Sequence, residues 1–338
     1  MAAERVRRPA MTDVAHRAGV SHQTVSRVLN GHPNVTDQTR TRVREAVLEL
    51  GYRPNTAARA LVTGRTQVLG IVGTGSTLHG PVSTLYGVEA AARAAGYTVS
   101  VASAPSIDAD AVLAAVDRLQ RQCVDGVVVI APLRSGADRL DEIAGQLPLV
   151  VVEGSPEGAL EVVAVNQADG ARAATQHLLD LGHVTVWHVA GQQGWFESAQ
   201  RVDGWRAALA AAGAAVPPLL TGDWTARSGY EAGQILARTP EVTAVFAAND
   251  STALGVLRAL HEAGRSVPSE VSVVGFDDVP DAAYLTPPLT TVRQDFAEVG
   301  RRALAVLLEQ LERGGPGSGH SRIPAELIVR LSTAPPTA

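Results

Sequence analysis

The sequence predicts two parts, an all-α head and an α/β body of two doubly wound parallel-sheet subdomains. Within the first 65 residues, apolar side chains recur every three or four positions in segments that end at glycine, which indicates short helices. From residue 67 onward, Val- and Ile-rich segments alternate with amphipathic ones, as in parallel sheets covered on both faces. The charge divides at the same place. Residues 1–65 hold eleven Arg against five Asp and Glu (11 − 5 = +6), and residues 66–338 hold eighteen against twenty-nine (18 − 29 = −11).

Three helices are expected in the head, over residues 11–19, 21–31 and 36–51. Polar residues that can cap a helix begin them: Thr12, Ser21 and Thr36. Their apolar stripes would form a small core from Val14, Ala18, Val25, Val28, Leu29, Val43, Val47 and Leu50. Only Gly19 and Val20 separate the first two helices, which is the spacing of a helix-turn-helix motif. The second helix of that motif lies in the major groove of DNA, and a basic head suits an anionic partner.

The second helix leaves polar side chains facing outward. Gln can pair with adenine and Arg with guanine, so Gln23 and Arg27, with the neighbouring His22, are candidates for reading bases. Short polar groups suit phosphate contacts, and here these are Ser21, Thr24, Ser26 and Asn30. The alternative is a three-helix bundle whose polar surface is merely solvated.

The stretches MTDVAHRAGVSHQTVSRVLNG and GYRPNTAARALVTGRT resemble the DNA-binding headpiece and hinge of the LacI/GalR family of bacterial transcriptional regulators. The resemblance runs through nearly the whole chain. It implies that His22, Gln23 and Arg27 are the recognition residues. It also implies a homodimer on a palindromic double-stranded operator, and we expect Tyr52 and Asn55 to contact DNA as well.

The segment Pro54–Thr66 is the expected hinge between head and body. Pro54 stops the preceding helix, and Asn55 could cap a short helix that reaches Leu61. One or two turns are not stable alone, so this helix should form only with help from a dimer partner and DNA. The family resemblance implies that Leu61 enters a minor-groove step at the operator centre and bends the duplex. The alternative is that Leu61 packs under the head.

The body is expected to contain two successive sets of strands, at 68–73, 97–103, 125–131, 148–154 and 161–166, and at 185–191, 244–250 and 271–278. A late strand at 290–296 and a helix at 298–312 would return the chain to the first subdomain. This is the bilobal architecture of periplasmic sugar-binding proteins, which close around a ligand. The predicted domains are a helix-turn-helix domain (9–55), a hinge (56–66), an N-terminal effector subdomain (67–165 and 294–325) and a C-terminal effector subdomain (166–293 and 326–334).

Ligands of open α/β sheets bind outside the carboxyl ends of the strands, where this sequence places polar and aromatic residues. Carboxylates, amides and guanidinium groups pair with sugar hydroxyls, and flat rings pack on apolar sugar faces. The predicted effector site comprises Thr74, Leu78, His79, Glu153, Trp195, Arg201, Trp224, Asn249, Asp277, Gln294 and Phe296. The family resemblance supports Arg201, Asn249 and Asp277 as ligand contacts.

His79 of this set, and four other polar or aromatic residues of the body, have structural alternatives. His79 could be an exposed loop residue, Asp250 and Asp278 are expected to cap the segments that follow them, and Trp187 and Trp205 are expected in the core. Three stretches resemble galactoside-binding members of the family: STLHGP, GDWTARSGY and PPLTTVRQDF. However, Ile130 stands where such members offer an Asn to the sugar, and Glu153 stands where they have the shorter Asp. The expected effector is therefore a galactoside or a related saccharide that lacks or repositions one hydroxyl.

Two other classes of function, an enzyme and a transport protein, share some of these features. A sugar cleft with Glu153 and Asp277 could hold the carboxyl pair of a glycosidase. The DNA-reading head argues against an enzyme, as does the lack of GxSxG and HExxH motifs, so no catalytic residue is expected. The helix-turn-helix and the lack of a signal peptide argue against a sugar-transport protein.

Composition sets the remaining expectations. No apolar run approaches the roughly 18 residues of a membrane span, so we expect no membrane partner and a cytoplasmic, nucleoid-associated protein. The single cysteine, Cys123, excludes an internal disulfide and a cysteine zinc site, and it is expected to pack as a small hydrophobic residue. No metal or cofactor is expected. No leucine heptad follows ELIVRLSTAPPTA, so we expect a dimer without the family's tetramerising helix.

Overall fold

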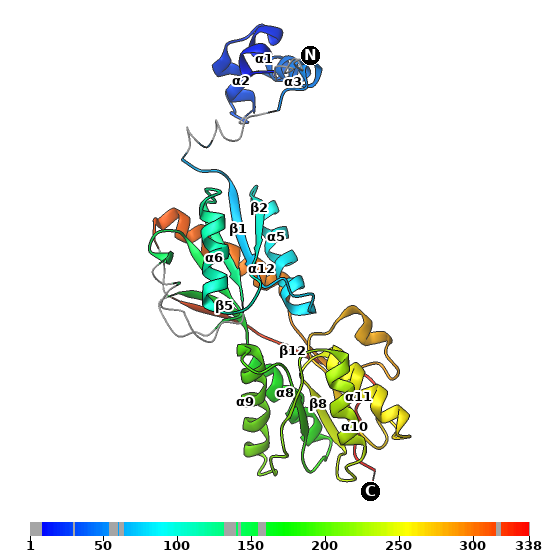
Figure 1. The fold of residues 1–338 in the computed structure, drawn as a ribbon. Coiled ribbons are helices and arrows are strands. Elements are labelled where there is room, and N and C mark those ends of the chain that lie inside the picture. The colour runs from blue at the N-terminus through cyan, green and yellow to red at the C-terminus, as the bar shows by residue number, and fades with distance from the viewer. Residues whose placement is uncertain are drawn as a thin grey trace, which may run out of the picture. The chain divides into compact units, whose positions relative to one another are not determined.

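The chain folds into two compact units, Met1–Thr66 and Gln67–Ala338, here called the head and the body (Figure 1). The computed structural model describes residues 9–29, 31–53, 60, 64–131, 140, 143–154, 160–315 and 319–337. In this part of the chain, no helix combines the length and the apolar character that crossing a membrane requires.

Residues 9–53 of the head, apart from the undescribed residue 30, form three helices: α1 (Met11–Ala18), α2 (His22–Leu29) and α3 (Asp37–Leu50). They bury one apolar core, whose members include Val14, Val25, Val28, Val43 and Ala46. The predicted caps of α2 and α3 are confirmed, because Ser21 Oγ accepts a hydrogen bond from Thr24 N at 3.2 Å and Thr36 Oγ1 accepts one from Thr39 N at 3.4 Å.

The predicted cap of α1 is wrong. This helix begins at Met11, so Thr12 already lies inside it, and the N-cap position is Ala10. The Asp13 carboxylate accepts a hydrogen bond from Ala10 N at 2.7 Å, which satisfies one of the free N–H groups at this end.

The first lobe of the body is a six-stranded parallel sheet in the order β11-β5-β4-β3-β1-β2. Alternate residues of β3 point to opposite faces, so Val127 and Val129 pack toward α6 while Val128 and Ile130 pack toward α5 and α12. Burial on both faces explains the unbroken Val and Ile runs. The elements are β1 (Val68–Gly73), α5 (His79–Ala94), β2 (Thr98–Ser103), α6 (Ala109–Gln120), β3 (Gly126–Ile130), β4 (Leu149–Val152), β5 (Glu161–Val165), α12 (Phe296–Arg313) and β11 (His320–Ile323).

The second lobe is a four-stranded parallel sheet in the order β7-β6-β8-β9. Helices α8 and α9 cover one face around Trp205 and Phe246, and α10 and α11 cover the other around Leu236 and Val256. The elements are α8 (Gln167–Asp180), β6 (Trp187–Ala190), α9 (Phe196–Ala211), β7 (Leu220–Thr221), α10 (Ala226–Ala237), β8 (Ala244–Ala247), α11 (Asp250–Glu262), β9 (Ser272–Val274) and the 3-10 turn η1 (Pro280–Tyr284).

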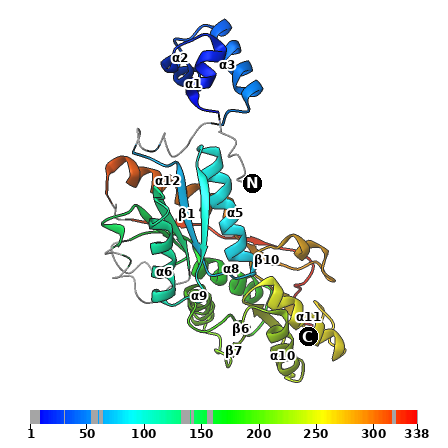
Figure 2. The same cartoon turned by 45° about the horizontal axis from the view of Figure 1, so that its top comes forward.

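The chain passes between the lobes three times (Figure 2). It leaves the first lobe after β5, returns to it through β10 (Thr291–Arg293) into α12, and leaves again from β11 into β12 (Glu326–Ile328). The strands β10 and β12 pair antiparallel to each other. The return of α12 to the first lobe confirms the predicted course of the chain.

Asp278 holds this crossing together. Its carboxylate accepts hydrogen bonds from Arg293 Nε at 2.7 Å and Arg330 Nη2 at 2.6 Å, so Asp278 does not cap the following segment as expected. Asp250 is not a cap either, because Asn249 caps α11 while Asp250 accepts from Val279 N at 2.8 Å and from the Thr291 hydroxyl at 2.5 Å.

The predicted fold class is confirmed, and every expected strand is present. The short strands β7, β11 and β12 were not predicted. The prediction for Cys123 is wrong: the residue follows α6 in a turn, adopts a φ of 55° and is exposed rather than packed in the core. Trp205 is fully buried as expected, and Trp187 is half-buried against the core of the second lobe.

Candidate functional site

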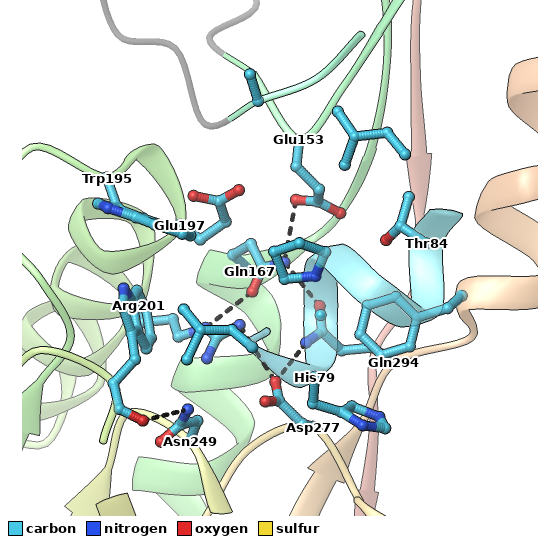
Figure 3. A pocket seen from close by; sticks show the side chains of 17 residues that line it. His79, Thr84, Glu153, Gln167, Trp195, Glu197, Arg201, Asn249, Asp277 and Gln294 are labelled. Carbon is cyan, nitrogen blue, oxygen red and sulfur yellow. Dashed lines mark hydrogen bonds and ion pairs between the residues drawn. The ribbon is translucent and has the colours of Figure 1, made fainter. Parts of the chain in front are cut away.

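A cleft opens in the body where strand ends of the two lobes face each other (Figure 3). It encloses about 570 Å³ of empty space, part of which is open to solvent. Ten of the eleven predicted effector-site residues line it: Leu78, His79, Glu153, Trp195, Arg201, Trp224, Asn249, Asp277, Gln294 and Phe296. Thr74 is not among the lining residues, and its hydroxyl is buried without a partner in the described part of the chain.

Three of the lining residues adopt left-handed backbone conformations that are unusual for residues with a Cβ. The φ angles are 58° at Glu153, 73° at Trp224 and 111° at Asp277. Glu153 directly follows β4, and Asp277 lies shortly after β9. Such conformations cost of the order of 1–3 kcal/mol each, and they are typical of positions that aim a side chain into a binding site.

Arg201 is the central cation of the cleft. Its Nε donates to Gln167 Oε1 at 2.9 Å, Nη1 donates to the Ala248 carbonyl, and Nη2 lies 3.6 Å from Asp277 Oδ1. Its guanidinium carbon lies 3.8 Å from the centre of the Phe276 ring. Buried charges are stable only when they are paired and hydrogen-bonded, and this guanidinium meets both conditions.

Two glutamine side chains extend the network from Arg201 to the first lobe. Gln167 Nε2 donates to Gln294 Oε1 at 2.8 Å and to Glu153 Oε2 at 3.2 Å. Gln294 Nε2 donates in turn to Asp277 Oδ1 at 2.6 Å. Glu153 follows a strand of the first lobe, whereas Asp277 belongs to the second, so the network joins the two lobes through amide groups (Figure 3).

Aromatic rings form the apolar walls. The Trp195 and Trp224 ring centres lie 5.7 Å apart at an interplanar angle of 59°, and the half-buried Leu78 packs against them. His79 meets Phe296 edge to face at 5.6 Å. Asn249 fixes the loop that carries Trp224, because its Nδ2 donates to the Trp224 carbonyl at 3.1 Å. Flat rings beside polar groups suit a ligand with both apolar faces and hydroxyls.

The carboxyl groups of the cleft are harder to ionise than ordinary carboxyls. Burial raises the pKa of Glu153 to about 7, although hydrogen bonds from Val165 N and Gln167 act in the opposite direction. Burial, and then the neighbouring Glu153 charge, raise the pKa of Glu197 to about 8. Burial also raises the pKa of Asp277, against the lowering influence of Arg201. Near neutral pH the cleft therefore holds carboxyls that can both donate and accept hydrogen bonds.

Sequence reasoning missed three polar residues that line the cleft: Thr84, Gln167 and Glu197. Gln167 and Glu197 lie in the first turns of α8 and α9, not at a strand end. A signal for Glu197 was present, since it precedes Arg201 by four residues and such pairs share one face of a helix. No metal site accompanies them, because the described residues contain no suitable group of three or more His, Cys, Asp or Glu side chains.

The head presents the predicted recognition residues on one helix. His22, Gln23 and Arg27 of α2 are exposed, and Thr24 and Ser26 are half-buried. The Ser21 and Thr24 hydroxyls lie 2.9 Å apart. Tyr52 packs in the core of the head with 7% of its surface exposed. The predicted contacts Asn30, Asn55 and Leu61 lie outside the described residues.

Comparison with known proteins identifies both parts. The model of the bacterial regulatory proteins of the lacI family matches residues 10–55, and that of the periplasmic binding protein-like domain matches residues 175–333. The chain is 34% identical to the lactose operon repressor of Escherichia coli (strain K12) over 328 residues, which cover 96% of this chain and 90% of that protein. It is also 36% identical to the HTH-type transcriptional regulator CelR of Thermobifida fusca over 341 residues, covering 96% and 97%.

The chain belongs to the LacI family. Solved structures of LacI-family proteins agree. A lac repressor dimer bound to operator and the anti-inducer ONPF superimposes with a TM-score of 0.88 at 32% identity, covering 97% of this chain and all of that one. A complex of CelR with cellobiose gives 0.69 at 32% identity, covering 96% and 100%. The predicted family is confirmed, and the chain is a transcriptional regulator rather than an enzyme.

Proposed function

We propose that the protein is a repressor that binds a palindromic operator as a homodimer and is released when a saccharide enters the cleft. The observation that carries this proposal is the cleft itself, in which Arg201, Asp277 and Gln294 form a buried polar network beside Trp195 and Trp224. Paired donors and acceptors next to flat rings are what a sugar requires.

The identity of the sugar is the finer part of the proposal. We propose a galactoside or a related saccharide as the effector, bound by the ten cleft residues named above. The relatives support this class, since one is the lactose operon repressor and another is seen bound to cellobiose. Buried Ile130 offers no hydrogen bond where it lines the cleft, which favours a saccharide without a hydroxyl at that place.

For DNA, we propose that His22, Gln23 and Arg27 read base edges, while Ser21, Thr24, Ser26 and Asn30 contact phosphates. The exposure of the first three on α2 supports this assignment. We also propose Tyr52 as a DNA contact; because its ring packs in the core of the head, only its hydroxyl would reach the DNA. Asn55 and Leu61 belong to the proposed hinge, where Leu61 would wedge into a minor-groove step.

We propose the domain limits given above, from residue 9 to residue 334, and a cytoplasmic protein that acts at the nucleoid. Release follows if the saccharide binds more tightly to the arrangement of the lobes that disfavours DNA. An effector shifts an equilibrium only by its difference in affinity for the two states.

The test has two arms. A thermal-shift screen of mono- and disaccharides should reveal a stabilising ligand, and that ligand should lower the affinity for an inverted repeat that flanks the protein's own gene. The Asp277→Ala variant should bind this DNA but not respond to the ligand. Asp281→Ala, at an exposed site in η1, is the matched control. Stabilisation by a purine or a phosphate ester but by no saccharide would refute the sugar assignment.

A further inference from the structure

Two polar atoms of the cleft are buried and have no hydrogen-bond partner within the described residues: Glu197 Oε2 and Trp224 Nε1. Trp224 is only 4% exposed, so water does not readily replace the missing partner. A buried polar group that stays unpaired is costly, and such groups are therefore rare in native proteins. In a ligand cleft, the expected partner is the ligand: an acceptor for Trp224 and a donor for Glu197.

Glu197 also has no cation hydrogen-bonded to it among the described residues. It extends from the first turn of α9 in the second lobe, and Glu153, which follows β4 of the first lobe, acts on it electrostatically. Figure 3 shows both carboxyl groups among the side chains that line the pocket. Arg201 is committed to Gln167, the Ala248 carbonyl and Asp277. Glu153 receives two hydrogen bonds, from Val165 N and Gln167 Nε2, whereas Glu197 Oε2 receives none.

We infer that Glu197 is a specificity-determining residue that accepts a hydrogen bond from a hydroxyl of a neutral saccharide and, with Glu153, excludes anionic sugars. This inference rests on the proposed function, because it requires a saccharide in the cleft. Where Glu153 and Glu197 are ionised, a carboxylate or phosphate on the ligand would meet like charges in a poorly solvated space, where they repel strongly. A hydroxyl can donate to Glu197 in either protonation state and can bridge toward Glu153.

The position of the tryptophans supports the same orientation of the ligand. Trp195 is the N-cap residue of α9, and both Trp195 and Glu197 line the cleft from the start of this helix (Figure 3). Trp224 lies beside Trp195. A sugar whose apolar face packs on Trp195 could direct hydroxyls of its edge toward Glu197 Oε2 and Trp224 Nε1, which lack partners among the described residues.

Binding of cellobiose, lactose and maltose to the full-length protein tests the inference, each compared with a counterpart in which a hydroxymethyl is oxidised to a carboxylate. Affinities are measured by calorimetry for the wild type, Glu197→Ala and Glu197→Gln at a pH above 8, where Glu197 and Glu153 are both ionised. Asp203→Asn is the matched control, because Asp203 is an exposed carboxylate on the same helix and does not line the cleft.

We expect the wild type to bind at least one neutral disaccharide and to reject its uronate. Glu197→Ala should weaken the neutral ligand by about 5- to 100-fold, as for a lost buried hydrogen bond. Glu197→Gln keeps an acceptor, so it should weaken the neutral ligand by less, while the discrimination against the uronate falls by about tenfold or more. Asp203→Asn should change neither quantity.

The outcomes separate the two claims. If the wild type binds a neutral disaccharide and both Glu197 variants retain its affinity and selectivity, the role of Glu197 is refuted and the proposed function stands. If no saccharide binds the wild type, both fall. Tighter binding of the glucosamine dimer than of cellobiose would also overturn the inference, since Glu197 would then select a cation rather than a hydroxyl.

Discussion

Removal of the Arg201 guanidinium should destabilise the second lobe more than any surface substitution. The side chain is buried, and Arg201→Ala would remove donors from Gln167 Oε1 and the Ala248 carbonyl. It would also leave Asp277 without its cation and Phe276 without the group stacked on its ring. Breaking a buried ion pair by removing one partner costs about 3–5 kcal/mol. Protonation of Asp277, whose pKa is already raised by burial, limits the loss to this range.

Urea unfolding followed by tryptophan fluorescence measures this cost. All four tryptophans, at positions 187, 195, 205 and 224, lie in the second lobe, so the signal reports this lobe and not the head. Arg172→Ala is the matched control, because Arg172 is exposed and its pair with Asp169, at 3.3 Å, lies on the surface of α8. Such pairs contribute about 0–1 kcal/mol.

A second variant keeps the test informative if Arg201→Ala does not fold. Arg201→Lys retains a positive charge near Asp277 but loses the planar fork and the stacking on Phe276, so its cost should be intermediate. If Arg201→Ala unfolds at the same urea concentration as Arg172→Ala, the buried network does not stabilise the lobe and the reasoning is wrong.

Three further predictions concern the same lobe. The folded pKa of Glu197 is raised from 4.5 to about 8, so its stabilising contribution is fully present below pH 4.5 and is lost as the pH rises through 8. The melting temperature should therefore fall between pH 6.5 and 8.5, a window above the range in which buried histidines titrate. Glu197→Gln should flatten this fall. If the slope of melting temperature against pH is unchanged in the variant, Glu197 is not the group that titrates. Gly191→Ala should cost about 1–3 kcal/mol in urea unfolding, because the new Cβ would overlap the Trp224 ring; wild-type stability would show that the ring moves freely. Asn249→Ala should cost about 1–2 kcal/mol by the same assay, because Asn249 caps α11 and donates to the Trp224 carbonyl, whereas the exposed Ser251→Ala should be near neutral.

The elements that could be predicted from the sequence are those whose pattern is local. The helix ends at Gly19 and Gly51 follow from the need for a left-handed residue, and φ is 64° and 59° there. The Val-rich strands follow from burial on both faces. In contrast, β11 and β12 are short and polar, and they become strands only through pairing with β5 and β10. A local sequence pattern does not show which strand, more than 30 residues away in the chain, a short segment pairs with.

The residues of the cleft likewise divide into those that the sequence predicts and those that it does not. The rule that ligands bind beyond strand ends located Glu153, Asn249 and Asp277, because each directly or closely follows a strand of a parallel sheet. It does not extend to Gln167 and Glu197, which enter the cleft from the first turns of helices. The hydrogen bonds of Gln167 to both Glu153 and Arg201 depend on how two lobes meet, and no property of the local sequence encodes that meeting.

The position of the cleft explains how a ligand there can act on the arrangement of the lobes. Asp277 and Asp278 are adjacent and both have positive φ, yet their carboxylates serve different networks. Asp277 faces the cleft and accepts from Gln294, whereas Asp278 binds Arg293 and Arg330 on the segments that cross between the lobes. The Asp277 backbone N–H also donates to the Val292 carbonyl of β10 at 2.8 Å. A ligand that changes the partners of Asp277 therefore acts on backbone that is hydrogen-bonded to a crossing strand, and the crossing segments are where a hinge between two lobes lies.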